Sequence, residues 1–257
     1  DFMQDWLPKQ NEYLQAILES EAPWGDESPV CSQCTQPAQF RCKDCLPSQI
    51  FCAACCCKSH RFQPFHRMDE WQGEYFHPCS KWQLRVGLYI SFGHGGDSCE
   101  QSQDSFKNPI LTVVHTNGLH FIQARFCVCR CEPLDRQCIA AGLYPASQRR
   151  VRTVFTQQVL DDCILDRVEC KTTTHNYFAK LRRLTSDTFP HLVADRYREL
   201  LRCVRQWIWI RARMKSGTAH DSPDGKDIKP GGLVTYCAAC PQPGVNLPEG
   251  WELDRES

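Results

Sequence analysis

The segment that decides the fold reads "CSQCTQPAQFRCKDCLPSQIFCAACCCKSHRFQPFH" and runs from Cys31 to His66. It holds eight cysteines and two histidines, and six of the cysteines form three C-x-x-C pairs. Each C-x-x-C can fold into a tight knuckle whose two sulfurs face one ion, and four donors complete the tetrahedral shell of zinc. Because the pairs are interleaved along the chain, we expect alternate pairs to share an ion in a cross-brace.

This spacing predicts two zinc sites with four protein ligands each. The predicted ligands of one site are Cys31, Cys34, Cys52 and Cys55, and those of the other are Cys42, Cys45, His60 and His66. Cys56 and Cys57 break the C-x-x-C spacing with Cys52, so they are not predicted as ligands. Neither site keeps an open position for a substrate, which is typical of structural zinc. The spacing resembles that of B-box zinc modules, and the resemblance implies the same use of alternate pairs.

The composition of the whole chain agrees with metal binding inside a cell. The 257 residues are 42% hydrophobic and include 19 cysteines, an odd number that cannot all pair within one chain. In a reducing compartment such a cysteine load indicates thiolate ligands rather than disulfides. The 30 basic and 30 acidic residues balance, so a nucleic-acid partner would have to be recognised by local charge clusters. No signal peptide and no apolar run long enough for a membrane span is expected.

A further group of cysteines, "CVCRC" at Cys127, Cys129 and Cys131, follows a predicted strand. Alternate residues of a strand share a face, so two of these sulfurs can hold one ion if partners come from elsewhere. The remaining C-x-x-C is Cys237 and Cys240, and its combination with Cys127 and Cys129 predicts a third zinc site.

A competing assignment of this third site uses a different donor pair. It takes His94 and Cys99 from "GHGGDSC" as the partners of the strand cysteines. Both assignments give four soft donors, which suit zinc.

The rest of the chain predicts a zinc-stabilised α+β fold. The B-box-like module is followed by a small antiparallel sheet, whose strands are expected in "WQLRVGLYISFGHG" and in "PILTVVHTNGLHFIQARFCVC". Asn117-Gly118 predicts a two-residue type I′ turn between two strands. The expected organisation is an amphipathic helix within 1–28, a double zinc module at 29–70, and a mixed region at 71–257 with a helical insertion at about 153–216 and a C-x-x-C segment at 233–251.

The last predicted helix carries a basic face. Its apolar stripe is expected to comprise Tyr197, Leu201, Val204 and Ile208. The neighbouring face can track a phosphate backbone and offers an indole for stacking on a base. The candidate nucleic-acid-binding residues on that face are Arg198, Arg202, Arg205, Trp209 and Arg213.

Several motifs, taken in order, resemble the CxC2-like cysteine cluster associated with KDZ transposases, a family known mainly from fungal genomes. The first are "CSQC", "FRCKDC", "FCAAC" and "HRMDEW" of the N-terminal segment. They are followed by "SFGHGGDSC", "NGLH", "FCVC", "LYPAS", "TVFT", "YFAKLRRLT" and "CAACPQPGVNLPEGW", so that the motifs together cover nearly the whole chain. In that family the cluster precedes a DDE-type catalytic domain with an RNase H-like fold. The resemblance therefore implies a zinc-binding accessory domain of a transposase, with the catalytic carboxylates beyond the residues given.

We therefore expect no enzymatic activity from this chain. The partners that the resemblance implies are transposon-end DNA and a transposase catalytic domain or another protein, with no membrane and no small-molecule substrate, in an intracellular and nuclear setting. The alternative is a B-box-type scaffold that binds proteins and not DNA. A hydrolytic zinc is not expected, because the sequence contains no His-Glu-x-x-His helix.

Overall fold

A computed structural model describes most of the chain. The described residues are 2–21, 29–102, 109–129, 131–220, 228, 232–233, 239–243, 246–247 and 250. The chain divides into two compact units, Asp1–Leu201 and Arg202–Ser257. No helix within the described ranges is both long enough and apolar enough to cross a membrane.

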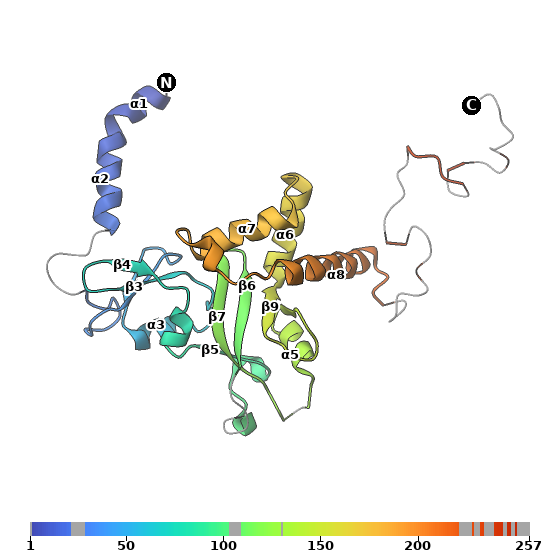
Figure 1. Ribbon diagram of the computed structural model, residues 1–257, viewed down its shortest axis with the longest axis horizontal. Helices are drawn as coiled ribbons and strands as arrows, with labels where there is room; N and C mark the ends of the chain where they lie inside the picture. Colours follow the sequence, from blue (N-terminus) through green and yellow to red (C-terminus); the bar gives the residue numbers. More distant parts are fainter. Residues whose placement is uncertain are drawn as a thin grey trace. The chain divides into compact units, whose positions relative to one another are not determined.

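The N-terminal segment is helical, as its periodicity predicts. It comprises α1 (Phe2–Trp6), the 3-10 turn η1 (Leu7–Lys9) and α2 (Gln10–Glu21), drawn in blue in Figure 1. Pro8 lies at the start of the 3-10 turn, a position that tolerates the missing N–H of proline. None of the side chains of these elements is buried, so the predicted apolar face is exposed in this structure.

The first sheet has four antiparallel strands in the order β2-β1-β3-β4. Its elements are β1 (Phe40–Cys42), β2 (Ile50–Phe51), the helix α3 (Ala53–Ser59), β3 (Met68–Trp71) and β4 (Phe76–Pro78). We call residues 29–79 the N-terminal cysteine module. The sheet continues beyond residue 70, the end of the module in the sequence analysis, because β4 pairs with β3.

The second sheet has five strands in the order β5-β7-β6-β9-β8 (Figure 1). They are β5 (Tyr89–Ser91), β6 (Ile110–His115), β7 (Gly118–Arg125), β8 (Leu143–Pro145) and β9 (Thr153–Thr156). Strand β7 is antiparallel to β6 and parallel to β5, while β9 is parallel to β6. The sheet is therefore mixed. The predicted antiparallel pairing is present between β6 and β7 and between β8 and β9, whereas the two parallel pairings, which long crossovers connect, were not predicted.

The hairpin between β6 and β7 is present, but its turn is displaced by one residue. His115 pairs with Gly118, which leaves Thr116 and Asn117 as the loop. Asn117 is not among the described non-glycine residues with positive φ, whereas Gly118 has φ 132°. A Cβ on Gly118 would lie 2.8 Å from Oγ1 of Thr185, the last residue of the later helix α7 (Thr174–Thr185), so close approach explains this glycine better than a type I′ turn.

The segment "WQLRVGLYISFGHG", predicted as a strand, begins with the short helix α4 (Trp82–Arg85) before β5. Trp82 and Gln83 are buried there. Trp82 Nε1 donates to the carbonyl of His66 at 2.9 Å, and Gln83 Nε2 donates to the carbonyl of Pro64 at 3.0 Å. Contacts with the N-terminal cysteine module thus override the β-type pattern of this segment.

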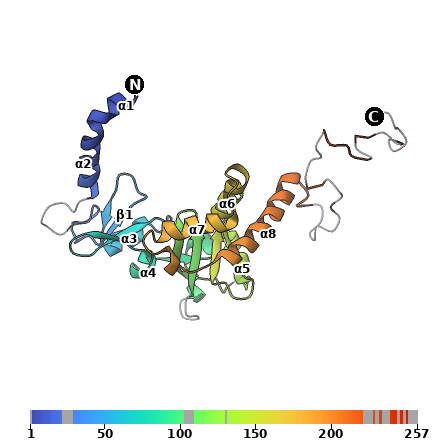
Figure 2. The same cartoon turned by 45° about the horizontal axis from the view of Figure 1, so that its top comes forward.

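The helical region starts after β9, four residues later than predicted, and Figure 2 shows α6 and α7 lying over the second sheet. The helices of this region are α6 (Gln157–Glu169), α7 (Thr174–Thr185), the 3-10 turn η4 (Pro190–Leu192) and α8 (Tyr197–Ser216). A shorter helix, α5 (Leu134–Ala140), lies earlier in the chain, between β7 and β8. Threonines cap α6 and α7: Thr156 Oγ1 accepts from the N–H of Val159, and Thr173 Oγ1 accepts from that of Asn176.

One hydrophobic core joins the N-terminal cysteine module to the second sheet. Phe40 and Phe51 of the module, Trp82 of α4, and Val113 and Ile122 of the second sheet belong to the same buried cluster. Four consecutive residues of β6 are buried, so both faces of this central strand are covered. The module therefore shares the hydrophobic core of the first unit and is not an independently folded domain joined by a linker.

Candidate metal centres

Two groups of four Cys and His side chains converge in the N-terminal cysteine module. The first cluster is Cys31, Cys34, Cys52 and Cys55, and the second cluster is Cys42, Cys45, His60 and His66. Within each cluster the potential ligand atoms all lie within 4.8 Å of one another. These are the two sets that the alternate-pair arrangement predicts, and Cys56 and Cys57 belong to neither.

The distances in the first two clusters match the edges of a zinc tetrahedron. With Zn–S near 2.3 Å and Zn–N near 2.0 Å, the S–S edge is about 3.8 Å and the S–N edge about 3.5 Å. In the first cluster, Cys34 Sγ lies 3.7 Å from the sulfurs of both Cys52 and Cys55. In the second cluster, Cys45 Sγ lies 3.4 Å from His60 Nε2 and 3.5 Å from His66 Nδ1. The donor types and the spacing fit zinc.

The helix α3 supports both clusters. Cys52 is its N-cap, where the sulfur accepts from the N–H of Cys55 at 3.4 Å, so one knuckle is built on the start of a helix. At the other end, Nδ1 of the buried His60 lies 3.1 Å from the carbonyl oxygen of Cys56. That contact assigns the proton to Nδ1 and turns the lone pair of Nε2 toward the sulfurs, as a carbonyl hydrogen-bonded to a metal-binding histidine does.

Outer contacts hold the loop that carries Cys42 and Cys45. Asp44 Oδ2 accepts from the backbone N–H of Arg67 at 2.6 Å, and Asp44 Oδ1 accepts from Arg67 Nη2 at 2.6 Å. These charge-assisted bonds to the Arg67 side chain outweigh the effect of burial and keep the pKa of Asp44 below its ordinary value. The ligand loop is thereby fixed beside His66.

The protonation of the thiols is consistent with sites that need a cation. Burial raises the pKa of Cys42 to about 12, and the hydrogen bond with the Cys52 thiol raises that of Cys55 to about 12. The pKa of Cys31 is lowered to about 6, because donation from backbone N–H groups outweighs burial. Burial also lowers the pKa of His60, so its imidazole is neutral. A bound dication would displace the thiol protons and relieve the repulsion between thiolates.

A third cluster lies in the second sheet's region. His94, Cys99, Cys127 and Cys129 bring one ligand atom each to within 4.8 Å of one another. His94 Nε2 lies 3.2 Å from the sulfurs of both Cys127 and Cys129, which are themselves 3.1 Å apart. Unlike the first two clusters, this one has two exposed members, His94 and Cys129.

The comparison with protein families points to this part of the chain. Residues 84–189 match the model of a family described as "CxC2 like cysteine cluster associated with KDZ transposases". No curated protein and no solved structure matches the chain. We call residues 84–189, which match this family model, the CxC2-like region. The CxC2-like region contains the whole third cluster, and it begins after the first two clusters.

The resemblance described above is confirmed over a narrower range than its motifs suggested. The motifs from "SFGHGGDSC" to "YFAKLRRLT" fall inside the CxC2-like region, and "CAACPQPGVNLPEGW" at 237–251 falls outside it. Cys237 lies outside the described residues, and Cys240 is exposed. Among the residues that the structure describes, the partners of Cys127 and Cys129 are thus His94 and Cys99, the competing assignment.

Backbone hydrogen bonds and a glycine turn build the third cluster. The hydrogen bond from the backbone of Val128 is the main reason that the pKa of Cys99 falls to about 6, while the neighbouring Cys127 thiol raises that of Cys129 to about 11. Gly93 (φ 86°) leads into His94 (φ 48°), and both have left-handed backbone conformations. The sequence signal that favours the competing assignment is this "GHGG" turn, which brings His94 to Cys127, two residues beyond the end of β7.

Gly93→Ala is expected to abolish metal binding by the third cluster. A Cβ at Gly93 would lie 3.0 Å from the Cβ and 3.6 Å from the sulfur of Cys127, in addition to the strain of positive φ. Native mass spectrometry should show the loss of one zinc equivalent and the retention of two.

Gly95→Ala is the matched control. Gly95 also has positive φ, at 66°, but its Cβ would meet no atom within 4 Å. It should therefore carry the strain without the clash and keep all of the zinc. Equal zinc loss in both variants would contradict a specific clash with Cys127.

The predicted nucleic-acid-binding residues lie on α8, and only part of the set is exposed. Arg198, Arg202, Arg205 and Trp209 are exposed and follow one another at helical spacing. Arg213, predicted on the same face, is buried, with its guanidinium 4.9 Å from the ring centroid of Trp209 and Nη2 donating to the carbonyl of Thr218. Arg213 therefore lies beside Trp209, as predicted, but it is buried and does not face solvent.

The apolar stripe of α8 is also rotated relative to the prediction. The buried residues are Leu200, Cys203, Val204 and Trp207, and Ile208 is exposed. Of the predicted stripe, Val204 alone is fully buried. The four buried residues are spaced i, i+3, i+4 and i+7, so they form an apolar helical stripe of their own, which includes the large indole of Trp207.

Proposed function

We propose that this chain is a zinc-binding accessory domain of a KDZ-type transposase or a transposase-derived protein, and that it contacts transposon DNA. The CxC2-like region and the three metal-suited clusters support a zinc-binding domain. In this proposal each cluster holds one Zn²⁺, and the first two form a B-box-like cross-brace. Four protein ligands per ion leave no position for substrate, so the proposal includes no catalysis. It places the protein in the nucleus, where transposon DNA resides.

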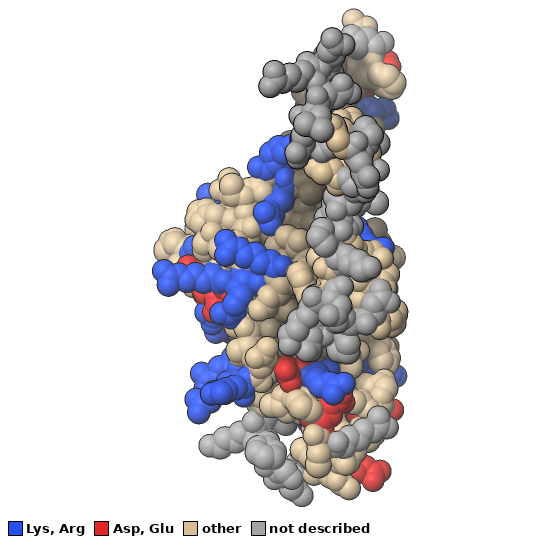
Figure 3. Space-filling model, turned by 90° about the vertical axis from the view of Figure 1, so that its right-hand side faces the viewer, with Lys and Arg blue, Asp and Glu red and all other residues tan. Residues whose placement is uncertain are grey.

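The observation that carries DNA contact is the exposed basic face of α8. Three arginines, Arg198, Arg202 and Arg205, occupy positions i, i+4 and i+7, with the half-exposed Trp209 one turn further on. No acidic residue interrupts this row, and Figure 3 shows that Lys and Arg side chains gather in groups on the face it views, with acidic side chains beside only some of them. Local clusters of this kind supply phosphate contacts although the formal net charge is zero.

We expect zinc-loaded protein to bind duplex DNA with an affinity that falls steeply with salt. Replacing Arg198, Arg202 and Arg205 together by Ala should weaken binding and reduce the slope of log K against log salt by about two to three, since each phosphate contact contributes about 0.9. Fluorescence anisotropy at several salt concentrations measures the slope.

The control replaces three other exposed arginines, Arg149, Arg150 and Arg152, by Ala. It removes the same charge from the chain and should leave the slope nearly unchanged. No DNA binding at low salt would overturn the DNA-contact part of the proposal, and an unchanged slope in the α8 variant would overturn the assignment to this helix.

A second candidate function is a protein-interaction scaffold without DNA binding. The observation that favours it is the exposed apolar surface of α1 and α2, where Met3, Leu7, Leu14 and Ile17 are each more than half exposed. An apolar helix face of this kind is typical of segments that dock in a partner's groove. Protein that binds a transposase catalytic domain through residues 2–21, and binds no DNA, would favour this role.

A further inference from the structure

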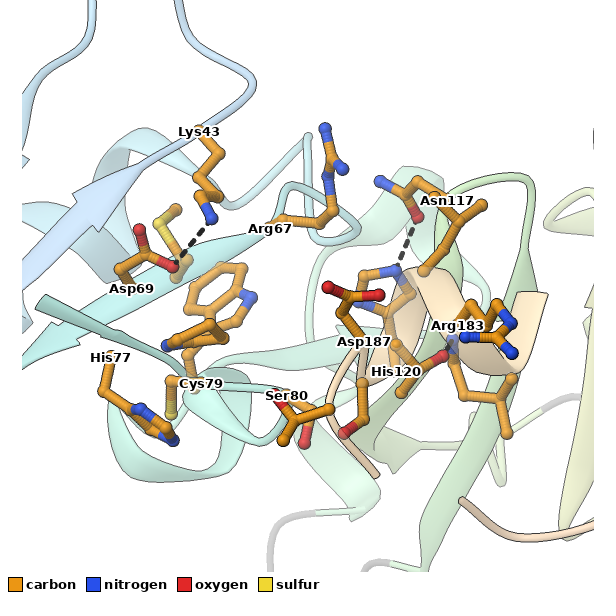
Figure 4. A pocket seen from close by; sticks show the side chains of 18 of the residues that line it. Lys43, Arg67, Asp69, His77, Cys79, Ser80, Asn117, His120, Arg183 and Asp187 are labelled. Carbon is orange, nitrogen blue, oxygen red and sulfur yellow. Dashed lines mark hydrogen bonds and ion pairs between the residues drawn. The ribbon is translucent and has the colours of Figure 1, made fainter. Parts of the chain in front are cut away.

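A cavity of about 780 Å³ lies within the first unit, between the N-terminal cysteine module and α7. Figure 4 shows Lys43, Asp69 and His77 on the side formed by the module, and Arg183 and Asp187 on the side formed by α7 and the segment after it. The volume is within the range of sites for small organic groups. None of the twelve residues of the three clusters lines the cavity, so it is a separate feature.

The wall of this cavity is largely apolar. Met68, Leu119, Leu184 and Phe189 contribute carbon surface to it. Phe189 is half-exposed, and its ring makes an edge-on contact with that of His191. An exposed aromatic ring beside an apolar wall is suited to a planar heteroaromatic group.

Cationic side chains exceed carboxylates around the mouth. The charged lining residues are Lys43, Arg67, Lys180, Arg183, Asp69 and Asp187. Asp69 is shared by two cations, with Arg41 Nη2 at 3.0 Å and Lys43 Nζ at 3.4 Å, so one positive charge is left over at this edge. Lys43 remains 45% exposed in its side chain and is accessible to a ligand.

Arg183 is the strongest candidate for an anion contact. Arg67 is engaged by Asp44 and Lys180 by Asp166. Across the described ranges, by contrast, Arg183 makes no ion pair, and it is exposed. An exposed guanidinium without an ion-pair partner can form a bidentate hydrogen bond with a phosphate, because no existing ion pair has to be broken first.

We propose that this cavity binds one unpaired nucleotide of a nucleic acid, with the base on the apolar wall beside Phe189 and the flanking phosphates at Arg183 and Lys43. The combination decides the class of ligand: an inorganic anion would not use the apolar wall, and a purely apolar group would not use the cationic mouth. The inference rests on the proposed function in one respect, that the partner is a nucleic acid. The two sites differ in the form they bind, because α8 is assigned to duplex DNA and the cavity to a base outside a duplex.

The test measures the binding of a short fluorescent oligothymidine to the full, zinc-loaded chain. Phe189→Ala and Arg183→Ala should each weaken binding about tenfold, the effect expected from losing one base-stacking or phosphate contact. The matched controls are Phe62→Ala and Arg167→Ala, an exposed phenylalanine and an exposed helical arginine that do not line the cavity. These controls should change the affinity by less than about twofold.

A variant with an expected gain guards against loss of folding. Asp187 is exposed and lines the cavity, so Asp187→Asn removes a repulsive charge and should tighten oligothymidine binding severalfold. Unfolding cannot produce such a gain. Unchanged or weaker binding by this variant, or equal loss in the Phe189 and Phe62 variants, would overturn the inference.

Competitors separate the possible ligands and separate this inference from the DNA role of α8. Thymidine monophosphate should displace the oligonucleotide better than inorganic phosphate does, and better than a polyglutamate peptide of equal charge does. Stronger displacement by polyglutamate would indicate an acidic protein partner and overturn the inference. The α8 triple-alanine variant should lose duplex binding and keep oligothymidine binding. Loss of both on α8 substitution would show that single strands bind to α8 and not to the cavity.

Discussion

Replacing Cys42 and Cys45 together by Ser is expected to unfold the first unit. Both residues belong to the second cluster, and Cys42 is fully buried within the core that continues into the second sheet. Structural zinc contributes about 10–16 kcal/mol of apparent free energy in small zinc domains, whereas a whole domain is stable by only about 5–15 kcal/mol. We therefore expect the loss of at least one zinc equivalent and of cooperative thermal unfolding, measured by native mass spectrometry and by circular dichroism.

The control for this prediction replaces Cys131 and Cys170 by Ser. Both are exposed cysteines outside the three clusters, so the variant loses two thiols without losing a ligand. It should keep its zinc and its melting temperature. If the Cys42 and Cys45 variant also melted like the parent chain with all of its zinc, the second cluster would not be a structural metal site.

Trp82→Ala is expected to destabilise the zinc-loaded chain by about 3–5 kcal/mol, the usual cost of removing a large buried aromatic side chain. Trp82 is 1% exposed, its ring centroid lies 5.7 Å from that of His60, and its Nε1 donates to the carbonyl of His66. It therefore touches two residues of the second cluster from outside. Urea denaturation should show the loss in stability, and zinc should be released to a chelator more rapidly.

Two further variants separate the contributions of Trp82. Trp82→Phe keeps most of the packing and loses the hydrogen bond to His66, so a smaller loss of about 1 kcal/mol is expected. Trp209→Ala removes a tryptophan that is 45% exposed and should change stability by much less than Trp82→Ala. Similar midpoints for the Trp82→Ala and Trp209→Ala variants would contradict the role of Trp82 in joining the module to the second sheet.

The two clusters of the N-terminal cysteine module could be predicted from the sequence because the information is local. A C-x-x-C brings two sulfurs together through one turn of backbone, as Cys52 and Cys55 do at the start of α3. Interleaving then restricts the ways in which three such pairs and two histidines can combine. The structure brings together the same eight residues.

The third cluster depends on contacts that spacing cannot express. Cys127 and Cys129 were identified as a donor pair, but their partners were open between two sets. The chain can turn back at His94 only because residue 93 is a glycine: any side chain at position 93 would collide with Cys127. The distance between position 93 and Cys127 cannot be predicted from the periodicity of the sequence. Likewise, the helical spacing places Arg213 beside Trp209 but does not reveal that Arg213 is buried there.

The sequence by itself determined which residues form the metal-suited knuckles and where the N-terminal helix and the β6–β7 hairpin lie. It also determined which family model residues 84–189 match, since each of these features depends on neighbours along the chain. The tertiary structure decided the parallel pairings of the second sheet, the partners of Cys127 and Cys129, and the cavity between the module and α7. These features arise where segments distant in sequence pack together, and packing depends on side-chain shape in three dimensions, to which a linear pattern is insensitive.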